Sequence, residues 1–200
     1  RVTATATVKN GKVTEVSFQN VPSFVYADNI KVDIPGIGST NVAISYGGDF
    51  YIFVEAADLG VQVTPQYSEE ILRYTKWLKE WGNRELKVIH PENPGIEGIY
   101  GVIVTDSTER TSNGWKSRET ASCHPGALDR SPCGTGTSAR MALMYSRGLM
   151  DPGQVLENYS IVNTMFRGSI DGLANVGQVK GIIPRIAGQA LVYPTLGVDP

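Results

Sequence analysis

A single thiol stands directly in front of a predicted helix. Cys133 precedes Gly134-Thr135-Gly136, and the residues from Ala139 to Tyr145 are apolar around most of a helical circumference, which is typical of a helix enclosed by other structure. The positive end of a helix dipole lowers the pKa of a thiol, and a thiolate can remove a proton near neutral pH. The position therefore predicts that Cys133 can act as a base.

The residues around this thiol have the chemistry to hold an amino acid. The backbone N–H groups of Gly134, Thr135 and Gly136 can converge on a carboxylate, because glycine leaves the backbone bare. Asp129, four residues before Cys133, can accept hydrogen bonds from an ammonium group. The predicted ligand is therefore a small molecule that carries both groups.

The same pattern has a simpler interpretation. A Gly-x-Gly loop before a helix is common packing chemistry, and a lone cysteine is more often an inert buried residue than a catalyst. On spacing alone, the packing interpretation is favoured. A phosphate-binding loop is excluded, because such a loop continues into Gly-Lys-Ser or Gly-Lys-Thr and neither follows Gly136.

Composition excludes several classes of partner. The 18 basic and 20 acidic residues form no block of like charges, so the chain has no electrostatic footprint for nucleic acid or an anionic membrane surface. No apolar run has the length of a transmembrane helix. A small-molecule partner is favoured.

The cysteines and histidines are too few for a disulfide scaffold or a metal site. Cys123 and Cys133 are the only cysteines, so a reducing compartment such as the cytoplasm is expected. With His90 and His124 the only histidines, and no Cys-x-x-Cys pair, metal-ligand spacing is absent. No metal is predicted.

Most of the chain is predicted to form short strands. Asn10-Gly11 supplies the positive φ angles of a tight hairpin between alternating segments at residues 1–8 and 13–18. The first strand is half-buried by pattern and needs a neighbour, which indicates that a segment upstream of residue 1 is missing. Further strands are expected at residues 21–26, 30–34, 40–46, 50–55, 98–105, 159–162, 166–170, 177–183 and 189–193.

Only two helices interrupt these strands. One is predicted from Ser68, its N-cap, to Gly82, where glycine ends the apolar periodicity. The other follows Cys133 and runs to Gly148. Strands and helices do not alternate as a parallel nucleotide-binding fold requires, so the predicted class is α+β, with a mainly antiparallel sheet curled around the helix after Cys133.

Four segments of the chain carry a family resemblance. The longest is Asp129-Arg130-Ser131-Pro132-Cys133-Gly134-Thr135-Gly136-Thr137-Ser138-Ala139-Arg140. The others are Asn20 to Val25, Tyr46 to Tyr51 and Asn163 to Gly168. In this order they resemble segments of the proline racemase and hydroxyproline epimerase family, over nearly the whole chain. The resemblance outweighs the packing interpretation of the thiol.

The resemblance implies a diaminopimelate-epimerase-like fold and a reaction that needs neither metal nor pyridoxal phosphate. In that family two cysteines face opposite sides of the substrate α-carbon: one removes a proton as thiolate while the other delivers a proton as thiol. Cys133 is similar to the second cysteine, Asp129 to the aspartate that binds the substrate amine, and residues 134–136 to the carboxylate-binding loop. The expected ligand is proline or hydroxyproline, and the expected assembly of the intact protein is a homodimer.

One half of that catalytic pair is absent from the sequence. The family's first cysteine lies in a Met-Cys-Gly-His stretch upstream of the matched region, and no Cys-Gly-His occurs here. The resemblance then implies that residues 1–29 are remnant strands of an N-terminal lobe, residues 30–188 a C-terminal lobe with the Cys-Gly-Thr-Gly loop, and residues 189–200 a strand returning toward the first lobe. The chain alone is expected to be a weak or inactive racemase.

Cys123 and His124 are candidates for substrate binding, because their neighbourhood contributes to substrate selection in the family. Cys123 is not expected to replace the missing cysteine, since one short segment cannot readily place two thiols on opposite faces of one α-carbon.

Three alternatives stay open. The chain can be another epimerase or isomerase of the diaminopimelate-epimerase-like superfamily, although the Asp-Arg-Ser-Pro lead-in argues against this. A related trans-3-hydroxyproline dehydratase usually has threonine in place of Cys133, so the cysteine favours epimerisation. The third alternative is a noncatalytic amino-acid-binding module. The sequence also leaves open the choice among proline, 4-hydroxyproline and related imino acids.

Overall fold

The computed structural model describes residues 3–123 and 126–189, which form twelve strands and two α-helices. The strands are β1 (Ala4–Lys9), β2 (Lys12–Gln19), β3 (Ser23–Ile34), β4 (Gly38–Tyr46), β5 (Phe50–Glu55), β6 (Gly101–Thr105), β7 (Glu109–Thr111), β8 (Gly114–Cys123), β9 (Ala127–Leu128), β10 (Val155–Tyr159), β11 (Met165–Val176) and β12 (Val179–Gly188). The α-helices are α1 (Ser68–Glu85) and α2 (Gly134–Ser146), and the short 3-10 helices η1 (Ala57–Leu59) and η2 (Pro65–Tyr67) precede α1.

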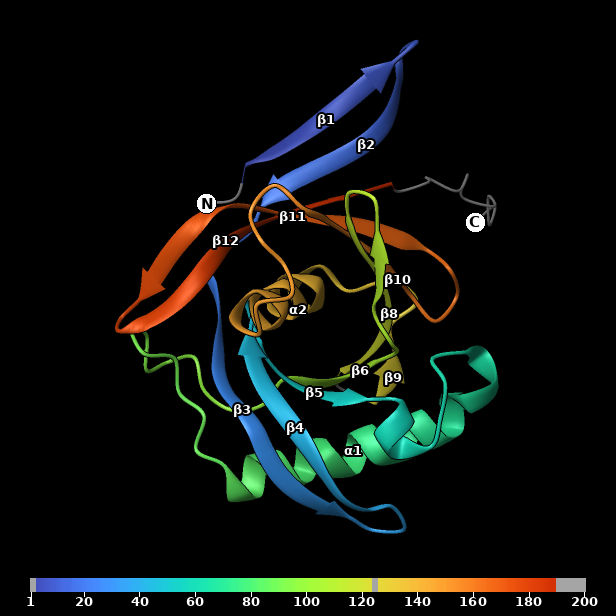
Figure 1. Ribbon diagram of the computed structural model, residues 1–200, viewed down its shortest axis with the longest axis vertical. Helices are drawn as coiled ribbons and strands as arrows, with labels where there is room; N and C mark the ends of the chain where they lie inside the picture. Colours follow the sequence, from blue (N-terminus) through green and yellow to red (C-terminus); the bar gives the residue numbers. More distant parts are fainter. Residues whose placement is uncertain (1–2, 124–125, 190–200) are drawn as a thin grey trace, which may run out of the picture.

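Hydrogen bonding closes the sheet into a barrel. The strand order is β1-β2-β12-β11-β10-β8-β6-β5-β4-β3, and β12 also pairs with β3, so the ring from β3 round to β12 closes on itself. In the described residues only β5–β6 and β8–β10 pair in parallel. Figure 1 looks into this ring and shows α2 within it and α1 outside. The predicted α+β class, with a mainly antiparallel sheet around the helix after Cys133, is confirmed.

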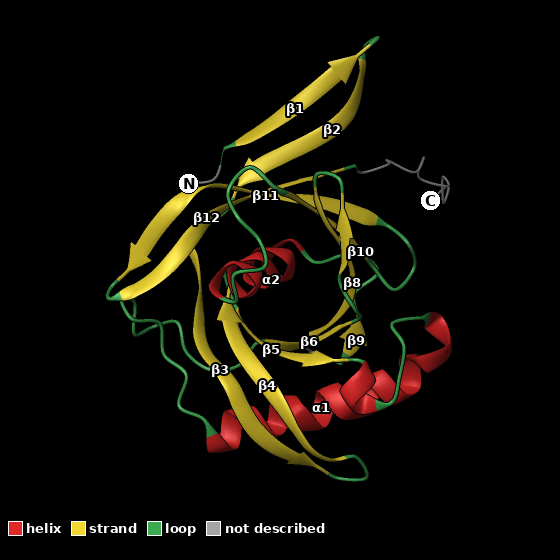
Figure 2. Ribbon diagram, viewed as in Figure 1, coloured by secondary structure: helices red, strands yellow, loops and turns green. Residues whose placement is uncertain are grey.

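The barrel interior is filled by α2. Every residue from Gly136 to Met144 is buried, as the all-round apolar pattern predicts. Such a helix has no solvent-facing side, and its position is fixed by strands on all sides. Figure 2 shows the contrast with α1, which crosses the outer face of β5 and β6.

Alternation along β5 divides its side chains between two cores. Ile52 and Val54 pack in the outer core together with Ile71 of α1. Tyr51 and Phe53 point the other way and pack in a cluster with residues of α2. Because successive side chains of a strand face opposite sides of the sheet, this parity directs Tyr51 toward the N-terminus of α2.

The N-terminal hairpin projects from the barrel (Figure 1). Its turn has positive φ at both Asn10 (51°) and Gly11 (72°), which confirms the predicted tight turn. Two parts of β12 have different neighbours. Residues Arg185 to Gly188 of β12 pair with β2, and Gly181 and Ile182 of β12 pair with β3. The hairpin and the barrel therefore share β12 as a common support.

Several predicted boundaries are wrong. The segments expected at residues 21–26 and 30–34 form the single strand β3, whose register shifts around Asn29, a residue with a φ of 56°. After α2, the predicted strands at 159–162, 166–170 and 177–183 give way to β10, β11 and β12, because glycines and exposed polar residues blur the apolar alternation there. Of the strand expected at 189–193, only Gln189 lies within the described residues.

Both predicted ends of α1 are also wrong. Tyr67 is the N-cap, and Ser68 is the first helical residue, with its hydroxyl donating to the Pro65 carbonyl (2.5 Å). Gly82 does not end the helix. A Cβ on residue 82 would lie 2.7 Å from Ile52 Cδ1, so glycine is needed inside α1 where the helix packs closely on β5.

Truncation of a side chain on α2 is expected to destabilise the protein strongly. Leu143 is 1% exposed within the barrel, so Leu143→Ala should lower the free energy of unfolding by about 2–5 kcal/mol. Leu149, just past the helix, is 41% exposed, and Leu149→Ala should change it by about 0.5 kcal/mol. Urea denaturation of the two variants measures the difference, and equal losses would contradict the enclosure of α2.

Candidate active site

The loop before α2 is tied both to itself and to the barrel wall. Asp129 Oδ1 accepts a hydrogen bond from the Ser131 N–H (2.8 Å), and Ser131 Oγ accepts one from the Cys133 N–H (3.1 Å). The Asp129 N–H donates to the Ala121 carbonyl of β8 (2.8 Å). These bonds fix the backbone that leads to the thiol, and Asp129 itself is half-buried.

Cys133 is itself the N-cap of α2. Its backbone has φ 63° and ψ 113°, a combination that an L-residue rarely adopts. The sulfur accepts a hydrogen bond from the Gly136 N–H (3.3 Å), in the manner of an N-cap side chain. A Cβ on residue 136 would lie 2.7 Å from Ile103 Cδ1 and 3.0 Å from Cys133 Sγ, so a side chain there would displace Ile103 or the capping sulfur.

The cap changes the expected use of the glycine loop. The Gly136 N–H, predicted to bind a carboxylate, donates to the sulfur instead. Gly134 and Thr135 occupy the first turn, where backbone N–H groups have no carbonyl partner within a helix. Binding of an anion by these two groups stays a prediction, as does the role of Asp129.

Two hydroxyl groups lie beside the sulfur. Tyr51 Oη and Thr135 Oγ1 are each 3.7 Å from Cys133 Sγ and 2.7 Å from one another. Whichever way the proton between the hydroxyls is arranged, one of them can donate to a thiolate. The Tyr51 hydroxyl is not predicted from the sequence as part of the site. The available signal was its parity in β5, which places it on the same face as Phe53.

Burial is the main influence on the thiol. Cys133 is 7% exposed, and the loss of hydration raises the pKa of its thiol above the usual value. Hydrogen bonds from Gly136, Thr135 and Tyr51 oppose this increase in pKa without cancelling it. The net result is a thiol pKa above its usual value, whereas the position before the helix predicts a lowered one, because desolvation of the thiolate is the larger effect.

The four segments that carry the family resemblance meet around this loop. The Asn20 side-chain amide donates to the Gly47 carbonyl (2.8 Å) and to Ser138 Oγ (2.9 Å), which joins the first two segments to α2. Thr164 Oγ1 donates to the Arg130 carbonyl (2.9 Å) and joins the last segment to the loop. Residues far apart in the sequence thus hold one turn of helix.

The β4–β5 turn packs directly on the first turn of α2. A Cβ on residue 47 would lie 2.1 Å from the Thr135 carbonyl oxygen and 2.6 Å from the Ala139 nitrogen. No side chain fits between the two backbones. Gly47 therefore sets how closely the turn approaches the thiol-bearing end of the helix.

Cys123 lies at the end of β8, half-buried against the cluster that contains Cys133 and Tyr51. Burial and the nearby Cys133 raise the pKa of its thiol to about 11, which makes it a poor base near neutral pH. The structure thus brings Cys123 toward the site, but its role in substrate binding stays a prediction. His124 lies outside the described residues.

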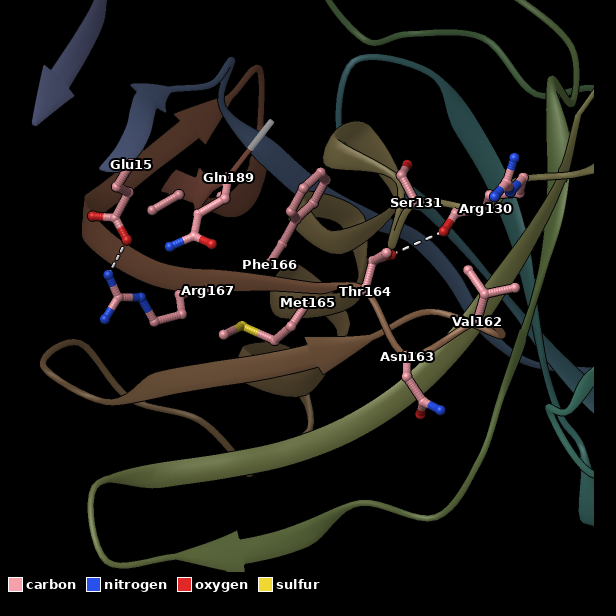
Figure 3. Close-up of a pocket in the computed structure, with 12 residues that line it drawn as sticks. Glu15, Arg130, Ser131, Val162, Asn163, Thr164, Met165, Phe166, Arg167 and Gln189 are labelled. Carbon is pink, nitrogen blue, oxygen red and sulfur yellow. Dashed lines mark hydrogen bonds and ion pairs between the residues drawn. The ribbon is translucent and has the colours of Figure 1, made fainter. Parts of the chain in front are cut away.

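A pocket of about 920 Å³ opens beside the loop (Figure 3). Arg130 and Ser131 of the loop border it, and Cys133 is not among its lining residues. In Figure 3 the Glu15–Arg167 ion pair closes one side, and the contact of Thr164 with the Arg130 carbonyl closes another. The pocket adjoins the site and does not contain the thiol.

Residues 3–123 and 126–189 contain neither a cluster of metal ligands nor a membrane-spanning helix. Within these ranges no group of three or more His, Cys, Asp or Glu side chains can hold a metal ion. Over the same residues, neither helix has the length and apolar character required to span a membrane.

Comparison with known proteins places the chain in a family. A family model described as proline racemase matches residues 1–200. The chain belongs to the proline racemase family. The proline racemase of Clostridioides difficile is 33% identical over 186 residues, which cover 93% of this chain and 55% of that protein. The trans-3-hydroxy-L-proline dehydratase of Azospirillum brasilense is 36% identical over 181 residues, covering 88% of this chain and 52% of that protein.

A solved structure confirms the family fold. The crystal structure of a hydroxyproline epimerase from Agrobacterium vitis, with bound trans-4-hydroxy-L-proline, matches with a TM-score of 0.88 and 31% identity. The match covers 96% of this chain and 54% of that one. The chain thus spans about half the length of the proline racemase relatives it matches.

Removing the Tyr51 hydroxyl is expected to raise the thiol pKa. A hydrogen bond to a charged group contributes about 1.5 kcal/mol, so Tyr51→Phe should move the pKa of Cys133 upward by about one unit. The pH dependence of iodoacetamide alkylation measures this, in a Cys123→Ser background where Cys133 is the sole thiol. Tyr26→Phe, whose hydroxyl instead donates to the Lys87 carbonyl, is the control. An unshifted alkylation curve for Tyr51→Phe would contradict this prediction and leave the Thr135 hydroxyl as the donor to the thiolate.

Filling the gap at Gly47 is expected to disturb both stability and the thiol. Gly47→Ala forces two backbones apart and should cost at least about 1–3 kcal/mol of unfolding free energy. In Gly172→Ala, the new Cβ would meet only Ile183 Cδ1 at 3.7 Å, an ordinary contact, so that control should remain close to wild type. Thermal unfolding checks the first effect and Cys133 alkylation the second. Equal behaviour of the two alanine variants would contradict the close packing.

Proposed function

We propose that this chain serves racemisation or epimerisation at the α-carbon of proline or hydroxyproline, with Cys133 as one of two catalytic thiols. The observation that carries the proposal is the N-cap geometry of Cys133 in the loop that carries the family resemblance, where the Gly136 N–H and one of two neighbouring hydroxyl groups can donate to its sulfur. In this mechanism the thiolate removes the α-proton from one face of the substrate. A thiol from outside this chain delivers a proton to the other face.

The proposed substrate pose uses polar groups of the loop that do not bond the Cys133 sulfur. The N–H groups of Gly134 and Thr135 would hold the carboxylate at the positive end of α2. Asp129 would accept hydrogen bonds from the substrate amine, because Oδ1 bonds the loop and Oδ2 has no hydrogen-bond partner among residues 3–123 and 126–189. The substrate α-carbon would then lie beside Cys133 Sγ, in a site with little water to compete for the donors.

The substrate class rests on the named relatives. The solved relative binds trans-4-hydroxy-L-proline, and the curated relatives are named for proline and hydroxyproline chemistry. An imino acid is therefore the proposed ligand. Dehydration is the competing activity, since dehydratases match at 36% identity, and the presence of a thiol at position 133 favours proton exchange over it.

The proposal includes an incomplete catalytic pair. We propose the division into remnant strands at 1–29, a lobe at 30–188 and a returning strand at 189–200, and a homodimer for the intact protein. Strand β3 passes through position 29 without interruption, apart from its shifts of register, so the two proposed parts share a strand.

Exchange of the substrate α-proton tests the proposal. The chain is incubated in D2O with L-proline and trans-4-hydroxy-L-proline, first alone and then co-expressed with the part of the Clostridioides difficile racemase that it does not match. The expected result is weak or no exchange by the chain alone and faster exchange with the added part. Cys133→Ser should reduce the exchange rate by about 10²- to 10⁴-fold, the usual contribution of a general base.

The second cysteine of the chain gives a matched control. Cys123→Ser removes a thiol of the same cluster without touching the α2 cap, and should lower exchange far less than Cys133→Ser, because Cys123 is proposed to contact the substrate and not to move the proton. Equal loss of exchange in Cys133→Ser and Cys123→Ser would contradict the assignment of Cys133 as the only catalytic thiol of this chain. Substrate binding without exchange, even with the added part present, would favour a binding module, and release of water from 3-hydroxyproline would favour a dehydratase.

A further inference from the structure

A buried carboxyl group lies beneath the first turn of α2, and the mechanism above does not use it. Glu119 of β8 is fully buried, at 0% exposed. It has the same parity as Ala121, which packs in the cluster with Cys133, so its side chain points into the barrel. Its Oε1 lies 3.5 Å from Thr137 Oγ1, and its Oε2 has no hydrogen-bond partner in the described structure.

Thr137 connects this carboxyl group to the backbone around the thiol. Its N–H donates to the Cys133 carbonyl (2.8 Å), and its Oγ1 lies 3.1 Å from the Pro132 carbonyl oxygen. The Asn158 side-chain amide donates to the same hydroxyl (2.8 Å). Glu119 is therefore one residue removed from the peptide units on either side of Cys133.

Few charged groups face Glu119. From α2 these are Arg140, itself 4% exposed, and Cys133, while β10 contributes the neutral Asn158. The Arg140 guanidinium makes its contacts elsewhere, with Glu55 (3.6 Å) and Thr108 (2.9 Å). Arg140 thus stabilises the Glu119 carboxylate by charge attraction at a distance and not by a direct hydrogen bond.

These surroundings bring the pKa of the Glu119 carboxyl group close to neutral pH. Burial raises the pKa of Glu119 to about 7, while Arg140, Asn158 and Thr137 act in the opposite direction. Its negative charge in turn raises the pKa of the Cys133 thiol. A like charge beside a thiol opposes its ionisation, so loss of the Glu119 charge should favour the thiolate.

We propose that Glu119 is a positioning residue for Cys133, which holds the first turn of α2 through Thr137 and couples its own charge state to that of the thiol. The inference rests on the proposed role of Cys133 as a base. With Glu119 neutral, the thiolate forms more readily. With Glu119 charged, the thiol loses its proton less readily.

Alkylation of Cys133 tests the coupling without any substrate. In the Cys123→Ser background, Glu119→Gln keeps the size of the side chain and an acceptor for Thr137, and removes the charge. The pH midpoint of iodoacetamide alkylation should fall by about one unit, the effect of a like charge within about 10 Å at an effective dielectric constant of about 20. Glu157→Gln, on the opposite face of β10 from Asn158, is the control and should leave the midpoint unchanged.

A second neutral variant separates charge from hydrogen bonding. Glu119→Met removes the acceptor as well as the charge, and should lower the midpoint by a similar amount if charge is responsible. A midpoint that stays at the wild-type value in both variants would overturn the proposal. Because the assay contains no imino acid, this outcome is distinct from a failure of the proposed racemase activity.

Stability gives an independent measure of the same group. The Glu119 pKa is raised from 4.5 to about 7 on folding, so its contribution to stability is present below pH 4.5 and is lost as pH rises through 7. The melting temperature of wild type should therefore fall over this range relative to Glu119→Gln. Parallel curves for the two proteins would contradict a buried, titrating Glu119.

Discussion

The absence of space between the β4–β5 turn and the first turn of α2 constrains the rest of the structure. Where residue 47 approaches the Thr135 carbonyl, only a glycine fits, so two backbones meet directly. Asn20 bonds both partners of this contact, and the barrel closes around the helix from the other sides. A displacement of any of these parts moves the residue that carries the thiol.

The enclosure that positions Cys133 also determines its electrostatics. A helix dipole favours a thiolate, but its effect is limited to the first turn and is smaller than the penalty for burying the charge. The protein offsets part of this penalty with short-range donors, namely the Gly136 N–H and the hydroxyl groups of Thr135 and Tyr51. The reactivity of this thiol is thus a property of the barrel interior more than of the helix alone.

Local patterns predict the class of the fold and the site loop, whereas long-range packing decides what they miss. The Asn10-Gly11 turn and the buried helix after Cys133 follow from short-range rules and are confirmed. Gly82 has the composition of a helix stop, but contact with Ile52, thirty residues earlier in the chain, makes it an interior residue. Tyr51 and Glu119 reach the site through strand parity and barrel closure, which no local window contains.

The backbone of Cys133 has a consequence for how this protein can change. A non-glycine residue at φ 63° and ψ 113° carries strain of about 1–3 kcal/mol, which the surrounding cap and loop bonds must overcome. Glycine at the same position would relieve that strain and remove the thiol. Mutations that increase stability and mutations that keep the thiol therefore compete at this one residue, and selection for a more robust fold alone would tend to eliminate the thiol.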